Sequence, residues 1–169
     1  MTTLNKKSGA GLRGHTTIWK VYPDGSREIV ADKKNQIVTV ALEVLQELLA
    51  QIVPGTPTPT DNQIATVKFE ASATPFANPA LPSDTGPTGS VALAYAFTTS
   101  DVNTSVGGSP GLMEFRGLMD RTQGNGQTIR AAGLYTTSDR LFARQLFGAI
   151  EKTNQFALEI RWRIQFLIL

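Results

Sequence analysis

Residues 156–169 read FALEIRWRIQFLIL and decide the fold. Apolar and polar side chains alternate along this stretch with a period of two, which is typical of a β-strand with one buried face. The residues that we expect to face inward are Phe156, Leu158, Ile160, Trp162, Ile164 and Phe166. The residues that we expect to face outward are Ala157, Glu159, Arg161, Arg163 and Gln165. A strand with one apolar face needs a second layer to cover it.

Strand patterns also precede this stretch along the chain. Residues 16–22 and 27–31 flank Pro23-Asp24-Gly25-Ser26, whose proline and glycine favour a turn, so this region predicts a hairpin. Further strands are predicted at residues 64–71, 91–97, 112–119, 127–136 and 141–150.

One segment has the periodicity of a helix. Between Ile37 and Val53 the apolar residues recur every three or four positions, Asn35 can cap the first turn, and Pro54-Gly55 ends the pattern. Seven or eight strands with one amphipathic helix predict a mainly β protein. We expect a jelly-roll or β-sandwich with the helix laid across it.

The length of 169 residues predicts one domain with an extended arm. Residues 1–15 hold three glycines and few large apolar side chains, so we expect a flexible basic arm before a single β-rich domain of residues 16–169. Residues 72–90 are rich in proline and contain one charged side chain, Asp84. This composition predicts a long loop, of the kind that is usually functional or ordered by a partner.

The composition disfavours enzymes, metal sites and cofactors. The chain has no cysteine and a single histidine, His15, so thiolate zinc sites and histidine-rich metal sites are ruled out. Residues 9–14 match G-x-G-x-x-G, but no strand precedes them and no helix follows, so we expect no phosphate site there. Glu43 and Glu47 lie one helical turn apart and are interpreted as a solvated helix face. We therefore expect no catalytic residue, no metal and no cofactor.

Net charge and hydropathy limit the partners. Sixteen Lys and Arg against 14 Asp and Glu give a net charge of +2, which attracts a polyanion only weakly, so nucleic acid is not an expected partner. No apolar stretch has the length of a signal peptide or a membrane span. We therefore expect a soluble protein that is made in the cytoplasm and does not bind membranes.

Basic residues at two places are candidates for contacts with a partner. Lys6, Lys7 and Arg13 make the arm basic, and they either dock on an acidic protein surface or belong to a solvated tail. Arg161 and Arg163 lie on the outward face of the last strand. There they either form cross-strand ion pairs or meet a neighbouring subunit.

Apolar residues at the end of the sequence are a third candidate. The last residues, including Leu167 and Leu169, are apolar on both faces of the strand, which favours burial against another chain. Trp19 and Trp162 lie in strands whose patterns bury them. Their burial counts against a carbohydrate-binding surface, which needs exposed aromatic side chains.

Two separated segments carry motifs. The first, NQIVT at residues 35–39, opens the predicted helix. The second consists of TIRAAGLY, LFAR, IEKT and the last strand, all between residues 127 and 166. Together they resemble a group of virion structural proteins of tailed bacteriophages, which pairs an N-x-V-T helix with T-I-x-E-x-G-L-F, L-F-A-R, I-x-K-T and L-x-I-x-W-x-I-x-F. The resemblance covers residues 33–53 and 127–166, and Ala131-Ala132 departs from the acidic residue of the group.

The resemblance implies a non-enzymatic protein of the phage particle. One implied function is that of a capsid decoration (cement) protein, a trimer that binds the outside of the capsid and stabilises it. Its partners are then the major capsid protein and its own copies, contacted through the terminal arms, and its location is the virion surface after assembly in the host cytoplasm. A tail, collar or fibre component is the alternative, and a carbohydrate-binding receptor tip is a third hypothesis.

Overall fold

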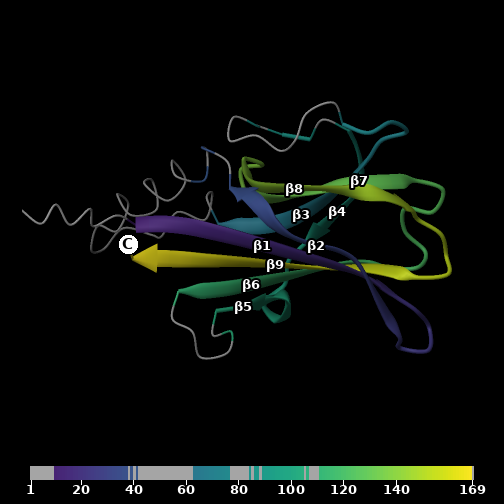
Figure 1. Ribbon diagram of the computed structural model, residues 1–169, viewed down its shortest axis with the longest axis horizontal. Coiled ribbons are helices and arrows are strands. Elements are labelled where there is room, and N and C mark those ends of the chain that lie inside the picture. Colours follow the sequence, from purple (N-terminus) through teal and green to yellow (C-terminus); the bar gives the residue numbers. More distant parts are fainter. Residues whose placement is uncertain are drawn as a thin grey trace, which may run out of the picture.

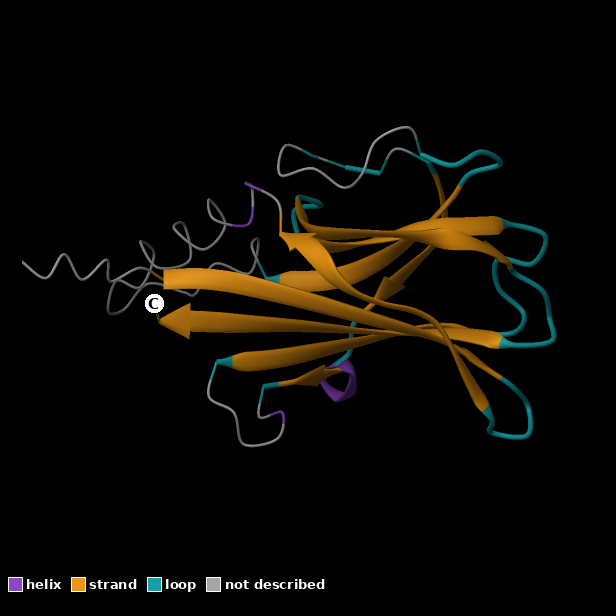
Figure 2. Cartoon of the chain, in the orientation of Figure 1, coloured by secondary structure: helices purple, strands orange, loops and turns teal. Residues whose placement is uncertain are grey.

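The computed structural model describes residues 10–37, 39, 41, 63–76, 84, 86–87, 89–104, 106 and 111–168. In this part of the chain antiparallel strands predominate (Figure 2). The strands are β1 (Ala10–Val21), β2 (Arg27–Ile37), β3 (Ile64–Ala71), β4 (Ser90–Ala96), β5 (Val102–Asn103), β6 (Leu112–Met119), β7 (Thr128–Thr136), β8 (Leu141–Glu151) and β9 (Ala157–Ile168). A short 3-10 turn, η2 (Thr99–Asp101), precedes β5. The prediction of a mainly β protein is confirmed, with nine strands among the described residues instead of seven or eight.

The strands form two antiparallel sheets that are joined by β2 (Figure 1). The first sheet has the order β2-β1-β9-β6-β5, and the second has the order β4-β3-β7-β8. Most of β2 pairs with β1, whereas Gln36 and Ile37 at its end pair with β8. Strands that follow one another in sequence, such as β1 and β2 or β7 and β8, are neighbours in the same ladder. The jelly-roll part of the prediction is not confirmed by this order.

The hydrophobic core lies between the facing sides of the two sheets. Strand β9 follows its predicted alternation, and its buried core residues are Leu158, Ile160, Trp162 and Ile164. The second sheet contributes Val67, Phe69, Ala132, Leu134 and Phe142. Gly117 of β6 allows the sheets to approach, because a side chain at this position would collide with Val67. Phe166 was predicted to face inward but is 40% exposed, since it lies near the end of its strand beside Gly111.

Trp19 also differs from its prediction. The buried residues of β1 are Gly14, Thr16 and Ile18, and the pairing with β2 slips between Ile18 and Trp19. Trp19 is therefore only half-buried, on the outer side of the first sheet. The predicted burial of Trp162 is confirmed.

The last six of the fifteen residues predicted as a flexible arm lie in a strand. Residues 10–15 belong to β1, where they pair with β9 and, from Gly14 onward, also with β2. Gly14 lies against the buried side chain of Asn35, and a Cβ atom at this position would collide with it. Backbone hydrogen bonds to neighbouring strands, together with the packing of Leu12 against the core, order this glycine-rich segment. Residues 1–9 lie outside the described part of the chain.

The predicted helix of residues 37–53 is not confirmed. Asn35, expected to cap it, is a buried residue within β2, and Ile37 is the last residue of the same strand. Pairing with β1 and β8 therefore overrides the capping signal at this point. Of the remaining residues in the predicted helix, the structure describes Thr39 and Ala41. Over the described residues, no helix combines the length and apolar character needed to span a membrane.

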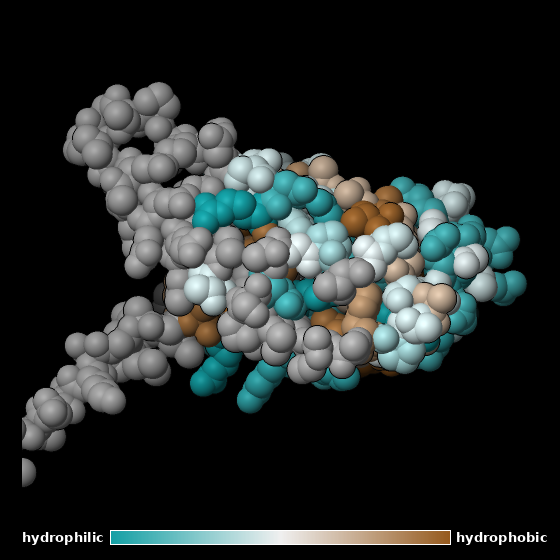
Figure 3. Space-filling view, turned by 90° about the horizontal axis from the view of Figure 1, so that it is seen from above, coloured by the Kyte–Doolittle hydropathy of each residue, from teal (hydrophilic) through white to brown (hydrophobic). Residues whose placement is uncertain are grey.

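The described parts of the proline-rich loop at residues 72–90 lie over the outer side of the second sheet (Figure 1). The Phe76 ring lies 5.2 Å from the guanidinium carbon of Arg144 on β8, and Asp84 accepts a hydrogen bond from the same arginine. The loop ends before Ser90, which already belongs to β4. Figure 3 views the molecule from this side, where polar and apolar groups are mixed and the end that carries the turns, on the right, is mainly hydrophilic.

Candidate functional site

Arginine side chains gather on the outer side of the first sheet. The alternation of β9 places Glu159, Arg161 and Arg163 there, as predicted. Arg116 of β6 is directly opposite Arg161 in the strand register, and Arg27 reaches the same region from β2. Three strands that are distant in sequence thus bring arginines to one surface.

At the centre of this surface is Glu159, whose side chain is only 1% exposed although it points away from the core. Arg116 donates a hydrogen bond from Nη2 to Oε2 at 2.8 Å, and Arg161 donates from Nε to Oε1 at 2.9 Å. Arg27 donates from Nη1 and Nη2 to the two carboxylate oxygens, at 3.3 and 3.2 Å. We call Arg27, Arg116, Arg161 and Glu159 the arginine cluster.

The protonation of Glu159 follows from this arrangement. Burial by itself raises the pKa of the Glu159 carboxyl, because removal from water disfavours the charged form. Hydrogen bonds from Arg161 and Arg116, together with the charges of Arg116 and Arg27, act in the opposite direction and hold the pKa below its ordinary value. Glu159 is therefore negatively charged at neutral pH.

The arginine cluster holds more positive charge than its carboxylate neutralises. Three guanidinium groups contact one carboxylate, which leaves a surplus of two positive charges. Arg116 and Arg161 are directly opposite each other on adjacent strands, and like charges in this arrangement are destabilising. The positive charge of Arg116 also lowers the pKa of the Asp101 carboxyl. This carboxylate is held in the η2 turn by hydrogen bonds from Thr98. The surplus is thus available to an anionic group from outside the protein.

The arginines of the cluster are accessible to such a group. The side chains of Arg27, Arg116 and Arg161 are between 31% and 48% exposed. The guanidinium carbon of Arg161 lies 5.3 Å from the centre of the Trp19 ring, a cation–π contact that restricts its orientation. Ile29, opposite Trp19 on β2, is 61% exposed and provides an apolar contact next to the charges.

The predicted contact residues of β9 have two different environments. Arg161 belongs to the arginine cluster, whereas Nε of Arg163 donates to Oε2 of Glu114 on β6 at 2.7 Å. The cross-strand ion pair that was one of the two alternatives for Arg163 is therefore present. Arg13 is exposed on β1, two strand positions from the half-buried His15.

The other predicted contact residues lie at the two ends of the chain. Leu167 is in β9 and pairs through its backbone with Gly11 of β1. The remaining three, Lys6, Lys7 and Leu169, lie outside the described residues. Their contacts with a partner therefore stay predictions.

Arg27 and Arg116 are cluster members that the sequence reasoning did not single out. Each lies in a predicted strand, at residues 27–31 and 112–119. The alternation of residues 112–119 indicated the outward direction of Arg116. In residues 27–31 the alternation placed Arg27 on the same face as Ile29, so the register slip beside Ile18 and Trp19 was needed to find its outward direction. The alternation of a strand does not show which other strands lie beside it. That Arg27 and Arg116 meet Arg161 around Glu159 is known only from the order of the strands in the sheet.

A second charged group lies on the outer side of the second sheet. Arg144 donates from Nε and Nη2 to the two oxygens of Glu70, at 3.2 and 2.7 Å, and from Nη1 to Asp84 at 3.1 Å. Burial lowers the pKa of Arg144, but the contacts with Glu70 and Asp84 outweigh it and raise the pKa above its ordinary value. The side chains of Arg144 and Glu70 are only 3% and 0% exposed. The contact between Arg144 and Asp84 therefore attaches the loop to the sheet, and the buried pair of Arg144 and Glu70 is not accessible to an external ligand.

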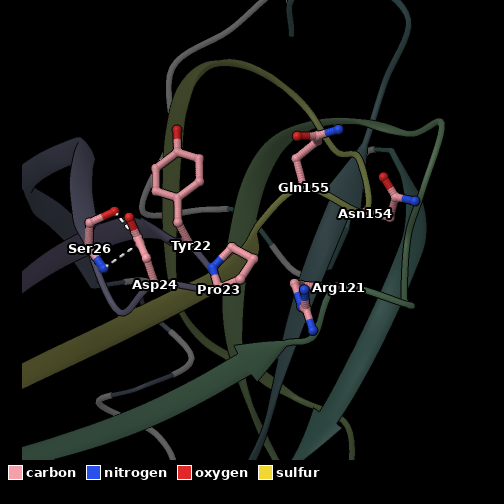
Figure 4. Close-up of a pocket in the computed structure, with 7 residues that line it drawn as sticks. All are labelled: Tyr22, Pro23, Asp24, Ser26, Arg121, Asn154 and Gln155. Atoms are coloured by element: carbon pink, nitrogen blue, oxygen red, sulfur yellow. Dashed lines mark hydrogen bonds between the residues drawn. The ribbon is translucent and has the colours of Figure 1, made fainter.

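An open cavity of about 690 Å³ lies at the end of the molecule where turns meet (Figure 4). Its lining residues are Tyr22, Pro23, Asp24, Ser26, Arg121, Asn154 and Gln155. The Asp24 carboxylate accepts hydrogen bonds from the backbone and side chain of Ser26, and the Tyr22 hydroxyl donates to Glu28. In Figure 4 the Tyr22 hydroxyl and the Arg121 guanidinium point away from each other. The polar groups do not converge on one point, so this cavity is the weaker candidate.

The described residues contain no group of three or more His, Cys, Asp or Glu side chains placed to hold a metal ion. Comparison of the chain with protein-family models, with curated proteins and with solved structures found no match. The arginine cluster is therefore the feature from which a function can be inferred.

Proposed function

We propose that this protein is a non-enzymatic structural protein of a tailed-bacteriophage particle, which attaches to the outside of the capsid and stabilises it. The observation that carries the proposal is the arginine cluster, because surplus positive charge on an exposed sheet face complements an acidic protein surface. The partners are the major capsid protein and further copies of this chain, which assemble as a trimer.

The motifs of the resemblance take ordered positions that support this proposal. TIRAAGLY forms most of β7, LFAR begins β8, and the last motif forms β9. Ala131, where the phage group carries an acidic residue, is opposite Glu70 in the register of β7 and β3. Glu70 provides the carboxylate that binds Arg144 of LFAR.

The terminal segments supply further contacts in this proposal. Their contribution comes from Lys6, Lys7, Arg13, Leu167 and Leu169. Ordering a flexible segment costs roughly 1–2 kcal/mol per residue, so such contacts form only on an assembled surface with many partners.

The proposal is tested by co-sedimentation of the purified full chain with capsids that lack it. We expect the chain to bind, and the double variant Arg116→Ala/Arg161→Ala to bind much less, because it loses two of the three cluster arginines. Arg121→Ala is the control for loss of positive charge elsewhere on the surface, since it removes one exposed arginine at the turn end, away from the cluster. Equal binding by the double variant and the control would contradict the proposal.

The copy number in purified virions separates the two positions in the particle. A trimer by light scattering, present in many copies per virion, supports the capsid role. A handful of copies, or a closed ring, supports the alternative of a tail, collar or fibre component. Absence of the protein from virions would contradict both.

A further inference from the structure

We infer that the arginine cluster binds carboxylate groups of an acidic protein segment, and that Glu159 is the positioning residue that holds the guanidinium groups for this contact. The inference rests on the proposed docking role of this face. It adds the chemical class of the group that is recognised and a role for a residue that does not touch the partner.

Hydrogen-bond donors remain on the arginines after Glu159 is bound. Each guanidinium carries five N–H groups in a planar fork. Arg161 uses Nε for Glu159, and Arg116 uses Nη2, so most N–H groups of both are not engaged by another described residue. A planar fork matches the two oxygens of a carboxylate in a bidentate contact. The free donors therefore suit Asp or Glu side chains of a partner.

The geometry of the cluster favours a carboxylate over a nucleic acid. Proteins that bind single strands combine a basic groove along the backbone with aromatic faces for base stacking. Here the Trp19 ring is already in contact with Arg161, and the surplus charge of the cluster gathers around the single carboxylate of Glu159. The net charge of +2 adds little long-range attraction for a polyphosphate. The exposed Ile29 beside the cluster instead suits an acidic segment that also carries an apolar residue.

Glu159 has a role that its charge alone does not suggest. It is negative, so it reduces the attraction of the surface for an anion. It also bridges Arg116 and Arg161, which would otherwise repel each other across the β6–β9 pair. Groups that are held in their binding geometry before contact lose less freedom on binding, which increases affinity. Preorganisation and simple attraction therefore predict opposite effects when the charge of Glu159 is removed.

The test is a calorimetric titration of the full chain with a hexaglutamate peptide whose ends are blocked. We expect Glu159→Gln to weaken binding by about fivefold or more, even though it makes the protein more positive, since one charge-assisted hydrogen bond corresponds to roughly tenfold in affinity. The matched control is Glu114→Gln, which adds the same charge on the same face but leaves the cluster intact. This control should bind as tightly as the original chain or slightly more tightly.

The conservative variants Arg116→Lys and Arg161→Lys decide the inference if Glu159→Gln does not fold. Both retain the charge and lose the planar fork, so each should weaken binding of the peptide to a similar extent. Unfolding in urea, followed for every variant, separates a loss of binding from a loss of structure. Unchanged affinity in both lysine variants would overturn the inference.

Two further results would overturn the inference. One is that Glu159→Gln binds the peptide as tightly as Glu114→Gln, which would mean that net charge alone determines affinity. The other is that a single-stranded oligonucleotide of equal charge binds more tightly than the peptide. Capsid binding without peptide binding would refute the inference and leave the proposed function standing. Peptide binding without capsid binding would refute the proposed function alone.

Discussion

The arginine cluster and the ion pair of Arg144 place charge on the outer sides of the two sheets in opposite ways. In the cluster, one buried carboxylate, Glu159, is shared by three arginines that remain partly exposed. Under the proline-rich loop, one buried arginine, Arg144, is shared by Glu70 and Asp84. The first group has an excess of positive charge that faces solvent, whereas the second is covered by Phe76 and other described parts of the loop.

The two groups differ in whether the charged side chains that remain can be hydrated when their partner is lost. If Glu159 loses its charge, the arginines around it can be hydrated, because each is already about a third to a half exposed. If Arg144 is removed, Glu70 remains fully buried with its charge no longer balanced by this arginine. A buried charge without its partner is far more costly than an exposed one. The Arg144 group therefore contributes mainly to stability, and the cluster mainly to the surface.

The largest effect is expected when Arg144 is replaced by methionine. Arg144→Met should lower the free energy of unfolding by about 3–5 kcal/mol, because it leaves the Glu70 carboxylate buried without its main partner. Unfolding in urea, followed by circular dichroism, measures this loss. The double variant Arg144→Met/Glu70→Leu should recover most of the stability. A single variant that costs less than about 1 kcal/mol would show that Glu70 reaches water.

Glu159→Gln should have a smaller effect, which depends on pH. At neutral pH we expect a loss of about 1–2 kcal/mol, since charge-assisted hydrogen bonds are replaced by weaker ones. The folded state holds the pKa of Glu159 below its unfolded value, so the ionised group contributes stability above the unfolded pKa of about 4.3. This contribution is lost as the pH falls through the folded pKa. Urea unfolding at neutral and acid pH should therefore show the two proteins converge in acid, and a constant difference would contradict the assignment.

Arg27→Ala should lower the free energy of unfolding by a smaller amount, about 0.5–1 kcal/mol, which is typical of partly exposed ion pairs. Its hydrogen bonds to Glu159 are the longest in the cluster, and Glu159 keeps its contacts with Arg116 and Arg161. Thermal unfolding compares this variant with Arg121→Ala, which should change little. A loss as large as that of Arg144→Met would mean that the two groups do not differ as described.

Glu114→Gln should have the smallest effect, at most about 0.5 kcal/mol, because it breaks a single pair with the exposed Arg163. Salt screens exposed charges, so the difference from the original chain should disappear in about 1 M salt. Thermal unfolding at low and high salt tests this. A difference in stability that persists in high salt would mean that the Glu114–Arg163 pair is shielded from solvent, as the buried pairs are.

The sequence predicted strands better than it predicted which way some of them face. Leu158 to Ile164 alternate cleanly between apolar and polar side chains, so both the strand and its buried face were correct. Strand β1 has large residues on both faces, with Ile18 on one and Trp19 on the other, so its pattern does not decide which face is buried. Because Trp19 is large and apolar, it was expected on the buried face, and this prediction is wrong. Its outward position is stabilised by Arg161, which the local sequence does not indicate.

The arginine cluster depends on information that no local pattern contains. Arg27, Arg116 and Arg161 meet because β2, β6 and β9 belong to the same sheet, with β1 between β2 and β9. Glu159 was correctly placed on the outer face, but its burial comes from the arginine side chains and not from the core. Asn35 shows the same limit, since its capping signal gave way to strand pairs formed with distant segments.

The pairing of β1 with β9 has a consequence for the order in which the protein folds. Ala10 is opposite Ile168, so the two ends of the described chain meet within the first sheet. This ladder pairs residues from the two ends of the described range, whereas the β7–β8 hairpin is local. We expect the hairpin to form early and the β1–β9 pair to limit the folding rate. A circular permutant that joins these ends by a short turn makes the slow contact local, and should fold faster to the same strand order.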